Sequence, residues 1–363
     1  MENLKNPKLQ NKLISLAFEQ AKINEGSTST NPSVGCIIEK NGSIISSGST
    51  SIGGRPHAEF NALSKNINFN NSNIYITMEP CTHIGKTPPC IDLIKKKKIK
   101  KVFFSVFDAD TRTKKKSIKI FKKNKILYKS KCLNKFGLKF YQSYFLSHNK
   151  SLPLIDAKIA VSKDFLTKKI KHKWITNKKS RNISHLLRSK YECLISTIKS
   201  INDDNSLLNC RINGLEKKSP DLVVIDRKLV FKKNLKIFNK NDYNRKIIFF
   251  TTNNNKKKIS FLKKNNIKVY ILKSLNNYND FVSFFLLLKK FKYNRIFIET
   301  GLTFLNFLIK KRFINYIYLF KTNIKLKKNG LNYSSNNLIK KIKLKNKIKV
   351  YLEGDLLYKE RLK

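Results

Sequence analysis

The segment TMEPCTHIGKTPPC, residues 77–90, constrains the fold of this chain more than any other stretch. It holds two cysteines, three prolines, one histidine and one glycine. Proline fixes its own backbone angle and lacks an N–H donor, so the segment predicts a rigid, irregular loop. A second stretch, HAEFNALSK at 57–65, places a histidine and a glutamate two residues apart where a helix is expected to begin. The fold must bring the two stretches together if they share a site.

His57, Cys81 and Cys90 have the side chains of a zinc site. Imidazole nitrogen and cysteine thiolate are usual zinc ligands, and a catalytic zinc keeps three protein ligands and one open position for water. Cys90 follows two prolines at an expected helix start, where the helix dipole favours a thiolate. Glu59 follows the histidine by two residues and is placed to take the proton of the water. The pattern predicts a catalytic Zn²⁺ site with Glu59 as the catalytic residue.

Two other interpretations of these side chains remain open. The cysteines could be a chance pair, or they could belong to a structural zinc site, which closes with four protein ligands. His83 would be the fourth ligand, but it lies only two residues from Cys81, so we expect it to face a substrate instead. Cys36 lies on an expected hairpin strand and is expected to be a core residue, as free cysteines usually are.

Short apolar runs alternate with helical periodicities along the chain and predict an α/β fold. In the first half, the turn signal Asn41-Gly42 predicts a β-hairpin. The other elements expected there are helices at 8–24, 57–65, 89–97 and 114–124 and strands at 73–77 and 101–107. The later part is expected to have strands at 154–161, 221–226, 246–251, 267–272, 295–299 and 316–321 and helices at 178–190, 279–291 and 303–311. We therefore expect two domains, residues 1–148 and 149–363.

The length of 363 residues also favours two domains, because single cores rarely grow that large. The longest apolar run, 281–288, cannot cross a bilayer, which needs about 20 apolar residues. The N-terminus has no apolar segment of the secretory type, so we expect a soluble, cytoplasmic protein without membrane contact. The six cysteines are then expected to be reduced thiols or metal ligands rather than disulfides.

The formal net charge of +54 suggests a nucleic-acid partner, but the distribution of lysine argues against one. Lysines occur along the whole chain together with many asparagines and isoleucines, three residues that share AT-rich codons. A protein that reads nucleic acid should concentrate its basic residues with aromatics in one groove. We therefore expect no specific nucleic-acid partner and a small phosphorylated molecule as substrate. The sequence leaves a homo-oligomeric assembly open.

The spacing of the motifs resembles a known family. HAE followed by EPC and a second cysteine is the signature of zinc-dependent deaminases, and here eight residues separate Cys81 from Cys90. Together with NPSVGCII at 31–38, these stretches resemble the deaminase domain of the bifunctional deaminase/reductase family of riboflavin biosynthesis. The resemblance implies a three-layer, cytidine-deaminase-like domain and a phosphorylated pyrimidine substrate. The substrate-binding residues that it implies are Asn31, His83 and Lys86.

The second half resembles the reductase domain of the same family. The matching stretches are AKIAVSKD at 157–164, KWIT at 173–176, residues 186–211, LVVID at 222–226 and IFIETGLTFLNFLI at 296–309. The resemblance implies a dihydrofolate-reductase-like fold that binds NADPH, although the chain has only 12 glycines and no G-x-G of a Rossmann loop. The implied cofactor contacts are Ala160, Trp174, Ser200, Asp204, Gly301, Leu302 and Thr303. The implied substrate contacts are Lys158, His172, Arg188, Leu208, Arg211 and Glu299.

Four of these residues carry the chemistry that we expect in the reductase. Arg188 and Arg211 suit the substrate phosphate, because a guanidinium presents a bidentate fork. Lys158 and Glu299 are expected to handle protons near the ribose C1. On composition alone, Trp174 is as readily a core residue as a cofactor contact. Arg188 lies in an expected helix with many basic neighbours, which also allows a surface position.

Three positions depart from the family's pattern. Phe165 stands where the family has glycine, and Asn205 and Leu302 stand where it has proline. We expect these losses to loosen the loops that hold NADPH, and we expect proline at 205 and 302 to tighten binding if the backbone angles fit. One alternative function is therefore an active deaminase with a degenerate reductase domain. The other, suggested by charge, is a polynucleotide deaminase.

Overall fold

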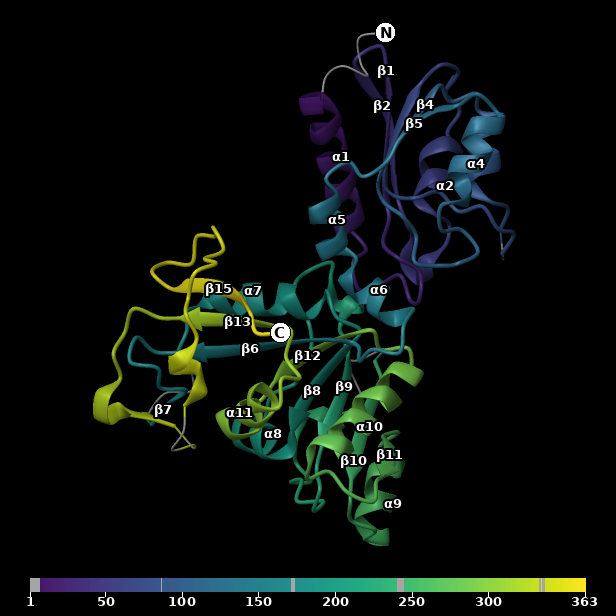
Figure 1. The fold of residues 1–363 in the computed structure, drawn as a ribbon. Helices are drawn as coiled ribbons and strands as arrows, with labels where there is room; N and C mark the ends of the chain where they lie inside the picture. Colours follow the sequence, from purple (N-terminus) through teal and green to yellow (C-terminus); the bar gives the residue numbers. More distant parts are fainter. Residues whose placement is uncertain (1–6, 86, 171–173, 240–244, 333, 335–336) are drawn as a thin grey trace. The chain divides into compact units, whose positions relative to one another are not determined.

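The computed structural model describes residues 7–85, 87–170, 174–239, 245–332, 334 and 337–363. The chain forms two compact units, Met1–Ser151 and Leu152–Lys363, which are described separately below as the first and second unit (Figure 1). Each helix in the described ranges is too short or too polar to span a membrane.

The first unit contains a five-stranded sheet in the order β2-β1-β3-β4-β5. Its strands are β1 (Gly35–Lys40), β2 (Ser43–Ser49), β3 (Asn73–Met78), β4 (Lys101–Val106) and β5 (Leu127–Lys129). Strand β1 is antiparallel to β2 and β3, whereas β3, β4 and β5 are parallel. The predicted hairpin is confirmed, because Asn41 and Gly42 connect β1 to β2 with φ of 51° and 85°.

Helices cover both faces of this sheet. They are α1 (Pro7–Lys22), α2 (Ala58–Leu63), α3 (Cys90–Lys96), α4 (Lys116–Lys123), α5 (Asn134–Phe140) and α6 (Gln142–Ser147). A Cβ on Gly35 would lie 1.8 Å from the carbonyl oxygen of Ala17 in α1, and a Cβ on Gly48 would lie 2.4 Å from that of Ala58 in α2. Gly48 pairs across the strands with Cys36, the neighbour of Gly35, so α1 and α2 lie on opposite faces. The two glycines let both helices approach closely, and α2 carries part of the site described below.

The second unit is built on an eight-stranded sheet in the order β11-β10-β9-β8-β12-β6-β13-β15. Only the pair β13 and β15 is antiparallel. The strands are β6 (Leu154–Val161), β8 (Cys193–Thr197), β9 (Asp221–Ile225), β10 (Ile247–Thr251), β11 (Lys268–Ile271), β12 (Arg295–Glu299), β13 (Tyr316–Lys321) and β15 (Leu356–Arg361). The short strands β7 (Lys168–Lys169) and β14 (Gly330–Leu331) pair separately.

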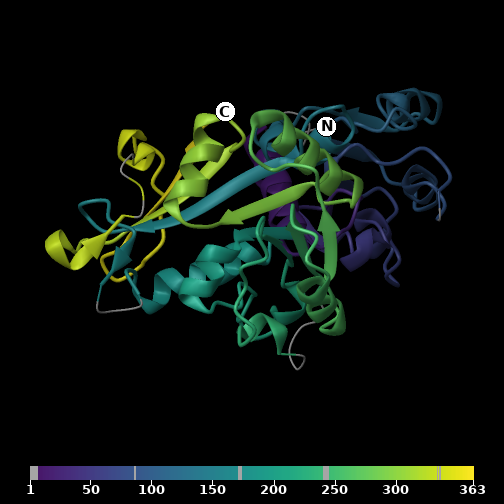
Figure 2. The ribbon, with the colours of Figure 1, turned by 90° about the horizontal axis from the view of Figure 1, so that it is seen from below.

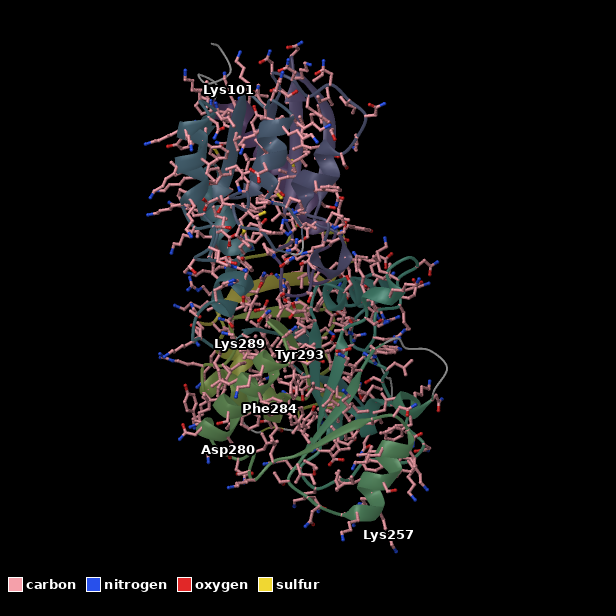
Figure 3. The ribbon with its side chains drawn as sticks, turned by 90° about the vertical axis from the view of Figure 1, so that its right-hand side faces the viewer. Lys101, Lys257, Asp280, Phe284, Lys289 and Tyr293 are labelled. Carbon is pink, nitrogen blue, oxygen red and sulfur yellow. The ribbon has the colours of Figure 1, made fainter. Side chains whose placement is uncertain are left out.

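The helices of the second unit lie on both faces of its sheet (Figure 2). They are α7 (Lys178–Arg188), α8 (Ile198–Asp204), α9 (Lys256–Lys264), α10 (Tyr278–Lys290) and α11 (Leu302–Lys310). Alternate residues of β9 serve two cores: Val223 belongs to the core under α10 and α11, and Val224 belongs to the core under α7, α8 and α9. Figure 3 shows Phe284 of α10 within the unit, whereas Lys257 projects from its edge. Lysine thus covers the outside of an aromatic-rich core.

The predicted α/β class is confirmed, and the strands expected at 154–161 and 316–321 have those bounds in the structure. All six cysteines are free thiols, and Cys36 is a buried core residue as expected. Several elements were not predicted from the sequence: α5, α6, β5, β8, α8, α9 and β15. Most of these are short or strongly basic segments, in which the apolar periodicity is weak.

Candidate functional site

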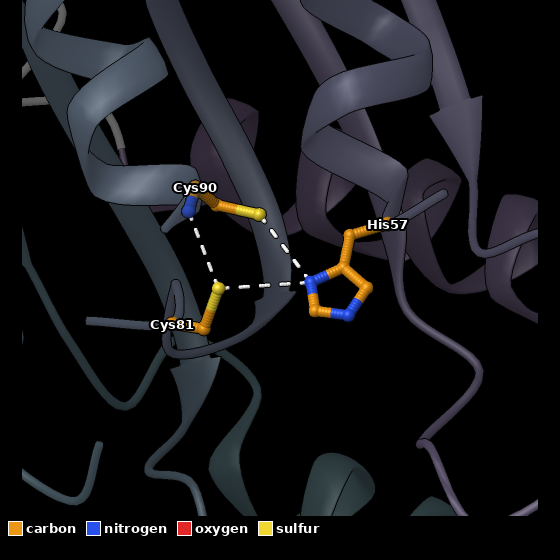
Figure 4. A group of neighbouring side chains, drawn as sticks. All are labelled: His57, Cys81 and Cys90. Carbon is orange, nitrogen blue, oxygen red and sulfur yellow. Dashed lines mark hydrogen bonds between the residues drawn. The ribbon is translucent and has the colours of Figure 1, made fainter. Parts of the chain in front are cut away.

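Three elements of the first unit bring His57, Cys81 and Cys90 together (Figure 4). His57 is the N-cap residue of α2, Cys81 lies in the loop after β3, and Cys90 is the first residue of α3. The Nδ1 atom of His57 lies 3.6 Å from Sγ of Cys81 and 3.4 Å from Sγ of Cys90. The two stretches that the sequence singled out therefore meet at one point.

These separations fit a tetrahedral zinc site. Zinc binds sulfur at about 2.3 Å and imidazole nitrogen at about 2.0–2.1 Å, which places N and S ligands of a tetrahedron about 3.6 Å apart. The three atoms of this group all lie within 4.8 Å of one another. In the part of the chain that the structure describes, His83 does not join the group, so the donor set matches a three-ligand site with one open position.

The two sulfurs differ in protonation. The pKa of Cys81 is lowered to about 4, chiefly by a hydrogen bond from the Cys90 thiol and then by His57, against the opposing effect of burial. The backbone N–H of Cys90 also donates to Sγ of Cys81 at 3.2 Å. The start of α3 thus stabilises the thiolate of Cys81. We had expected this stabilisation at Cys90, but the pKa of Cys90 is raised by its hydrogen bond to Cys81 and by burial. A bound dication would hold both sulfurs as thiolates.

Glu59 lies in the first turn of α2 and is only 4% exposed. Burial raises the pKa of its carboxyl to about 7, and the neighbouring Cys81 charge adds to the effect. A group with such a pKa can both accept and release a proton near neutral pH, which is what a general acid–base residue needs.

The expected substrate residues of this unit lie around the same loop. The side-chain amide of Asn31 donates to the carbonyl oxygen of Gly54 at 2.8 Å, three residues before His57. Nδ1 of His83 is 3.0 Å from the hydroxyl of Thr113. Lys86 lies outside the described residues.

Glu79, which was not predicted as a site residue, anchors the loops on this side of the sheet. Its buried carboxylate accepts from the backbone N–H groups of Asp108, Lys115 and Ser117 and, at 2.6 Å, from the Ser117 hydroxyl. Because Glu79 lies two residues before Cys81, it fixes the loop that carries the thiolate. The signal was present in the motif EPC, where a glutamate follows an otherwise apolar strand.

In the second unit, a cavity of about 430 Å³ opens at the carboxyl ends of β8, β9 and β12. Four of the residues expected at the cofactor line it: Ser200, Gly301, Leu302 and Thr303. The hydroxyl of Ser200 accepts from the backbone N–H of Gly301 at 2.9 Å and lies 3.1 Å from the Thr197 hydroxyl. The start of α11 is thereby tied to α8 across the cavity.

Three basic residues that line this cavity were also missed, Lys199 of α8 and the pair Arg227 and Lys228. Arg227 and Lys228 are exposed and follow the end of β9 after one residue, Asp226. The Arg227 guanidinium donates to two neutral groups, the side-chain oxygen of Asn276 at 2.9 Å and the carbonyl oxygen of Leu275 at 3.4 Å. The place of Arg227 and Lys228 after the strand LVVID could have marked them, because ligands bind at the carboxyl ends of such strands.

A buried ion-pair cluster adjoins the cavity at Glu299, the residue before the cavity-lining Thr300. Arg188 holds the Glu299 carboxylate with two hydrogen bonds, from Nε at 2.5 Å and from Nη2 at 2.9 Å. Nζ of Lys158, on the adjacent strand β6, lies 3.9 Å from the same carboxylate. Burial alone would raise the pKa of Glu299, but Arg188 and then Lys158 outweigh burial and lower it to about 2.

The contacts of Arg188 do not match the expected role of binding the substrate phosphate. Its side chain is 9% exposed, so the surface interpretation is wrong. Its remaining terminal nitrogen donates to the carbonyl oxygen of Asn209 at 3.0 Å and lies 3.2 Å from Nδ1 of His185. The fork is thus occupied within the protein. Arg211 is exposed and donates to the side chain of Asn209 at 2.7 Å.

The other expected reductase residues are dispersed. Trp174 is 51% exposed beside the guanidinium of Arg181, so the core interpretation of this tryptophan is wrong. Leu208 is buried in the core under α7, α8 and α9, and Ala160 packs against that core from β6. Asp204 ends α8, and its charge acts on Lys158. His172 lies outside the described residues.

Comparisons with known proteins agree with this arrangement. Residues 7–106 match the family model of the cytidine and deoxycytidylate deaminase zinc-binding region, and residues 153–325 match that of the RibD C-terminal domain. The riboflavin biosynthesis protein RibD of Buchnera aphidicola subsp. Baizongia pistaciae is 31% identical over 314 residues, which is 84% of each chain. The chain belongs to the RibD family. A second relative, RibD of Aquifex aeolicus, is 28% identical and is also covered to 84%.

Two further matches bear on the separate parts and on the fold. The diaminohydroxyphosphoribosylamino-pyrimidine deaminase of Buchnera aphidicola subsp. Schizaphis graminum is 37% identical over 138 residues, 38% of this chain and 94% of its own. The solved deaminase/reductase of Thermotoga maritima has a TM-score of 0.81 at 23% identity and covers 98% of this chain and 99% of its own. The expected pairing of a cytidine-deaminase-like domain with a dihydrofolate-reductase-like domain is confirmed.

The structure also shows what replaces the family's glycine and prolines in this RibD family member. Phe165 has a φ of 64°, a left-handed conformation that favours glycine, yet its N–H still donates to Ser162 and the turn forms. Asn205 is also left-handed, with a φ of 44°, as the C-cap of α8. Proline cannot adopt that angle, so the expectation that proline tightens this loop is wrong at 205. Leu302 is the first residue of α11, where proline is tolerated.

Proposed function

We propose that residues 1–148 are a zinc-dependent deaminase domain that acts on 2,5-diamino-6-ribosylamino-4(3H)-pyrimidinone 5′-phosphate. We propose further that residues 149–363 are a reductase domain that uses NADPH to convert 5-amino-6-(5-phosphoribosylamino)uracil to its ribitylamino product. The observation that carries the proposal is the triangle of His57, Cys81 and Cys90 with the buried Glu59 beside it. Membership of the RibD family supplies the pathway, riboflavin biosynthesis, and the two reaction types, deamination and reduction.

In the first domain, His57, Cys81 and Cys90 would hold Zn²⁺, which when bound supplies a Lewis acid that lowers the pKa of water. Deamination replaces the amino group of a pyrimidine carbon by oxygen from water and releases ammonia. Glu59 would take a proton from the water and deliver it to the departing amine. A pKa of about 7 suits both steps, because the carboxyl group changes protonation state twice in one turnover.

In the second domain, the cavity after β8, β9 and β12 would hold NADPH, which when bound supplies the hydride for the ribose C1. Glu299, with a pKa of about 2, stays ionised and cannot serve as a proton donor near neutral pH. Lys158 is the better donor, because burial lowers its pKa, although the Glu299 carboxylate opposes that shift. Arg188 would fix the Glu299 carboxylate, which in turn orients the Lys158 ammonium.

The test uses the purified full-length protein and the diaminopyrimidine phosphate, with and without NADPH. We expect ammonia release in both cases, and with NADPH the ribitylamino product and one NADPH oxidised per ammonia released. Ammonia release without NADPH oxidation would support the alternative of a degenerate reductase, which the altered residues at 165, 205 and 302 motivate. Absence of ammonia release from the zinc-loaded protein would contradict the deaminase assignment.

A further inference from the structure

Arg55 precedes the zinc-site histidine by two residues, and its positive charge acts on His57. The guanidinium donates from Nη1 to the hydroxyl of Thr87 in the loop that carries Cys81 and Cys90. A Cβ on Gly85 would lie 3.0 Å from Nη2 of Arg55 and 3.9 Å from Nε2 of His83. Arg55 and His83 therefore flank Gly85, which leaves both side chains close to the loop.

The segment before Arg55 contacts the other expected substrate residue. A Cβ on Gly54 would lie 2.9 Å from the side-chain nitrogen of Asn31, which donates to the Gly54 carbonyl oxygen. Arg55 thus lies between Asn31 on one side and His83 on the other. These are the two described residues that we expect to bind the substrate of the deaminase.

The charge of Arg55 is not neutralised by the chain. Among the residues that the structure describes, no carboxylate forms an ion pair with Arg55, which is half-buried and bonds the neutral hydroxyl of Thr87. The charge of Arg112 in the same unit is neutralised, because its Nε and Nη2 donate to the carboxylate of Asp110 at 3.0 and 2.6 Å. A guanidinium with donors left over suits an anion from outside the chain.

We propose that Arg55 binds the 5′-phosphate of the deaminase substrate and selects phosphorylated over unphosphorylated pyrimidine nucleosides. This inference rests on the proposed function of the first domain and adds a specificity-determining residue to it. The phosphate of such a substrate carries a charge near −2 at neutral pH, and the planar fork of an arginine matches two of its oxygens. The backbone of Gly85 packs against the Arg55 guanidinium, and its lack of a side chain keeps a Cβ from pressing on that group.

The experiment compares Arg55→Gln with wild type on the diaminopyrimidine phosphate and on the same compound after removal of its phosphate. We expect Arg55→Gln to raise KM for the phosphorylated substrate by about 10- to 100-fold, the usual range for a lost hydrogen bond to a charged group. The KM for the dephosphorylated substrate and the zinc content should not change. Inorganic phosphate should inhibit wild type competitively and inhibit Arg55→Gln far less, and Arg55→Lys should recover part of the preference.

Two control variants separate direct contact from other effects. Arg112→Gln removes the same charge from the same unit, but its guanidinium is already paired with Asp110, so the preference for phosphate should persist. Thr87→Val breaks the hydrogen bond between Arg55 and the loop but keeps the positive charge, so this variant should keep the preference for the phosphorylated substrate. The inference is overturned if Arg55→Gln keeps the wild-type ratio of the two KM values, loses zinc, or behaves like Thr87→Val. If zinc-loaded wild type deaminates neither compound, the proposed function itself is wrong.

Discussion

Arg188 and Glu299 are 111 residues apart in the sequence and form a buried, bidentate ion pair with N–O distances of 2.5 and 2.9 Å. The pair joins the end of α7 to the end of β12. It also places a fixed negative charge beside Lys158 and beside the cavity proposed for NADPH. The pair is thus a structural support and part of the proposed reductase site.

Removing one partner of this pair should destabilise the second unit strongly. Arg188→Leu leaves the Glu299 carboxylate buried without its main partner, which typically costs about 3–5 kcal/mol. Chemical denaturation followed by fluorescence would measure the loss of stability. Lys179→Gln is the control, because Lys179 and Glu353 form an ion pair with both side chains nearly half exposed, which contributes about 1 kcal/mol or less. Equal effects of the two substitutions would contradict the assignment.

His185 and Glu299 should each make the second unit less stable as the pH falls below 6.5, whereas Glu192 opposes them, because burial raises its pKa to about 7. Burial and the charges of Arg188 and Arg211 lower the pKa of His185 from 6.5 to about 4, and Glu299 is lowered from 4.5 to about 2. Both groups bind fewer protons in the folded than in the unfolded chain, so their contributions are complete above pH 6.5. His185 loses its contribution between pH 6.5 and 4, and Glu299 loses its own between 4.5 and 2. His185→Gln should flatten the upper range in denaturant titrations, and an unchanged slope there would contradict the prediction.

Glu59→Gln should abolish deamination and leave zinc in place. The glutamine amide cannot accept the proton from water and pass it to the amine, so the rate should fall by at least about 10²–10⁴-fold, the usual contribution of general acid–base catalysis. Metal analysis should still find one zinc per chain, whereas Cys81→Ser with Cys90→Ser should lose it and Cys132→Ser should keep it. Reduction of the pre-deaminated substrate should proceed normally in Glu59→Gln, because that reaction is proposed for the other unit. Near wild-type ammonia release would remove Glu59 from the mechanism.

Arg227 should contribute to the choice of NADPH over NADH. The two cofactors differ by one phosphate. Arg227 is a cation that lines the cavity and donates hydrogen bonds to neutral groups, the side chain of Asn276 and the carbonyl oxygen of Leu275. Arg227→Gln should weaken NADPH binding by about 10-fold or more and leave NADH binding unchanged. Fluorescence titration with both cofactors would measure the ratio. Lys232→Gln, an exposed lysine that does not line the cavity, is the control; an unchanged ratio in Arg227→Gln would count against this role.

Local signals explain which parts of the structure were predictable. The motifs HAE and EPCTHIGKTPPC fixed three side chains of one site because each motif carries its own helix start or rigid loop. The Asn41-Gly42 turn and the strand at 154–161, which is apolar except for Asp156 and Lys158, are equally local. Such features depend on nearest neighbours in the sequence, so spacing and residue type are enough to find them.

Other features depend on contacts between distant segments. Nothing near Arg188 indicates that its guanidinium is occupied by Glu299. The motif EPC marks Glu79 but gives no sign of its three backbone donors from residues 108–117. The strand at 193–197 was missed, although tertiary contacts bury most of it at the centre of the sheet. These features depend on packing between distant segments, and such packing leaves no periodic pattern in a single sequence.

Asn205 offers a test of whether the altered loops are defects or adapted to this chain. Its φ of 44° ends α8, its N–H donates to the Ile201 carbonyl oxygen at 2.8 Å, and its side chain accepts from the N–H of Lys236 at 2.8 Å. Asn205→Pro loses the N–H and cannot reach the angle, so it should destabilise the second unit by about 3 kcal/mol or more. Asn205→Gly keeps both the angle and the N–H, so it should lose only the side-chain hydrogen bond, about 1 kcal/mol. Denaturant titration of both variants, with NADPH binding as a second readout, would show whether proline stabilises this loop; if it does, the left-handed cap at Asn205 is wrong.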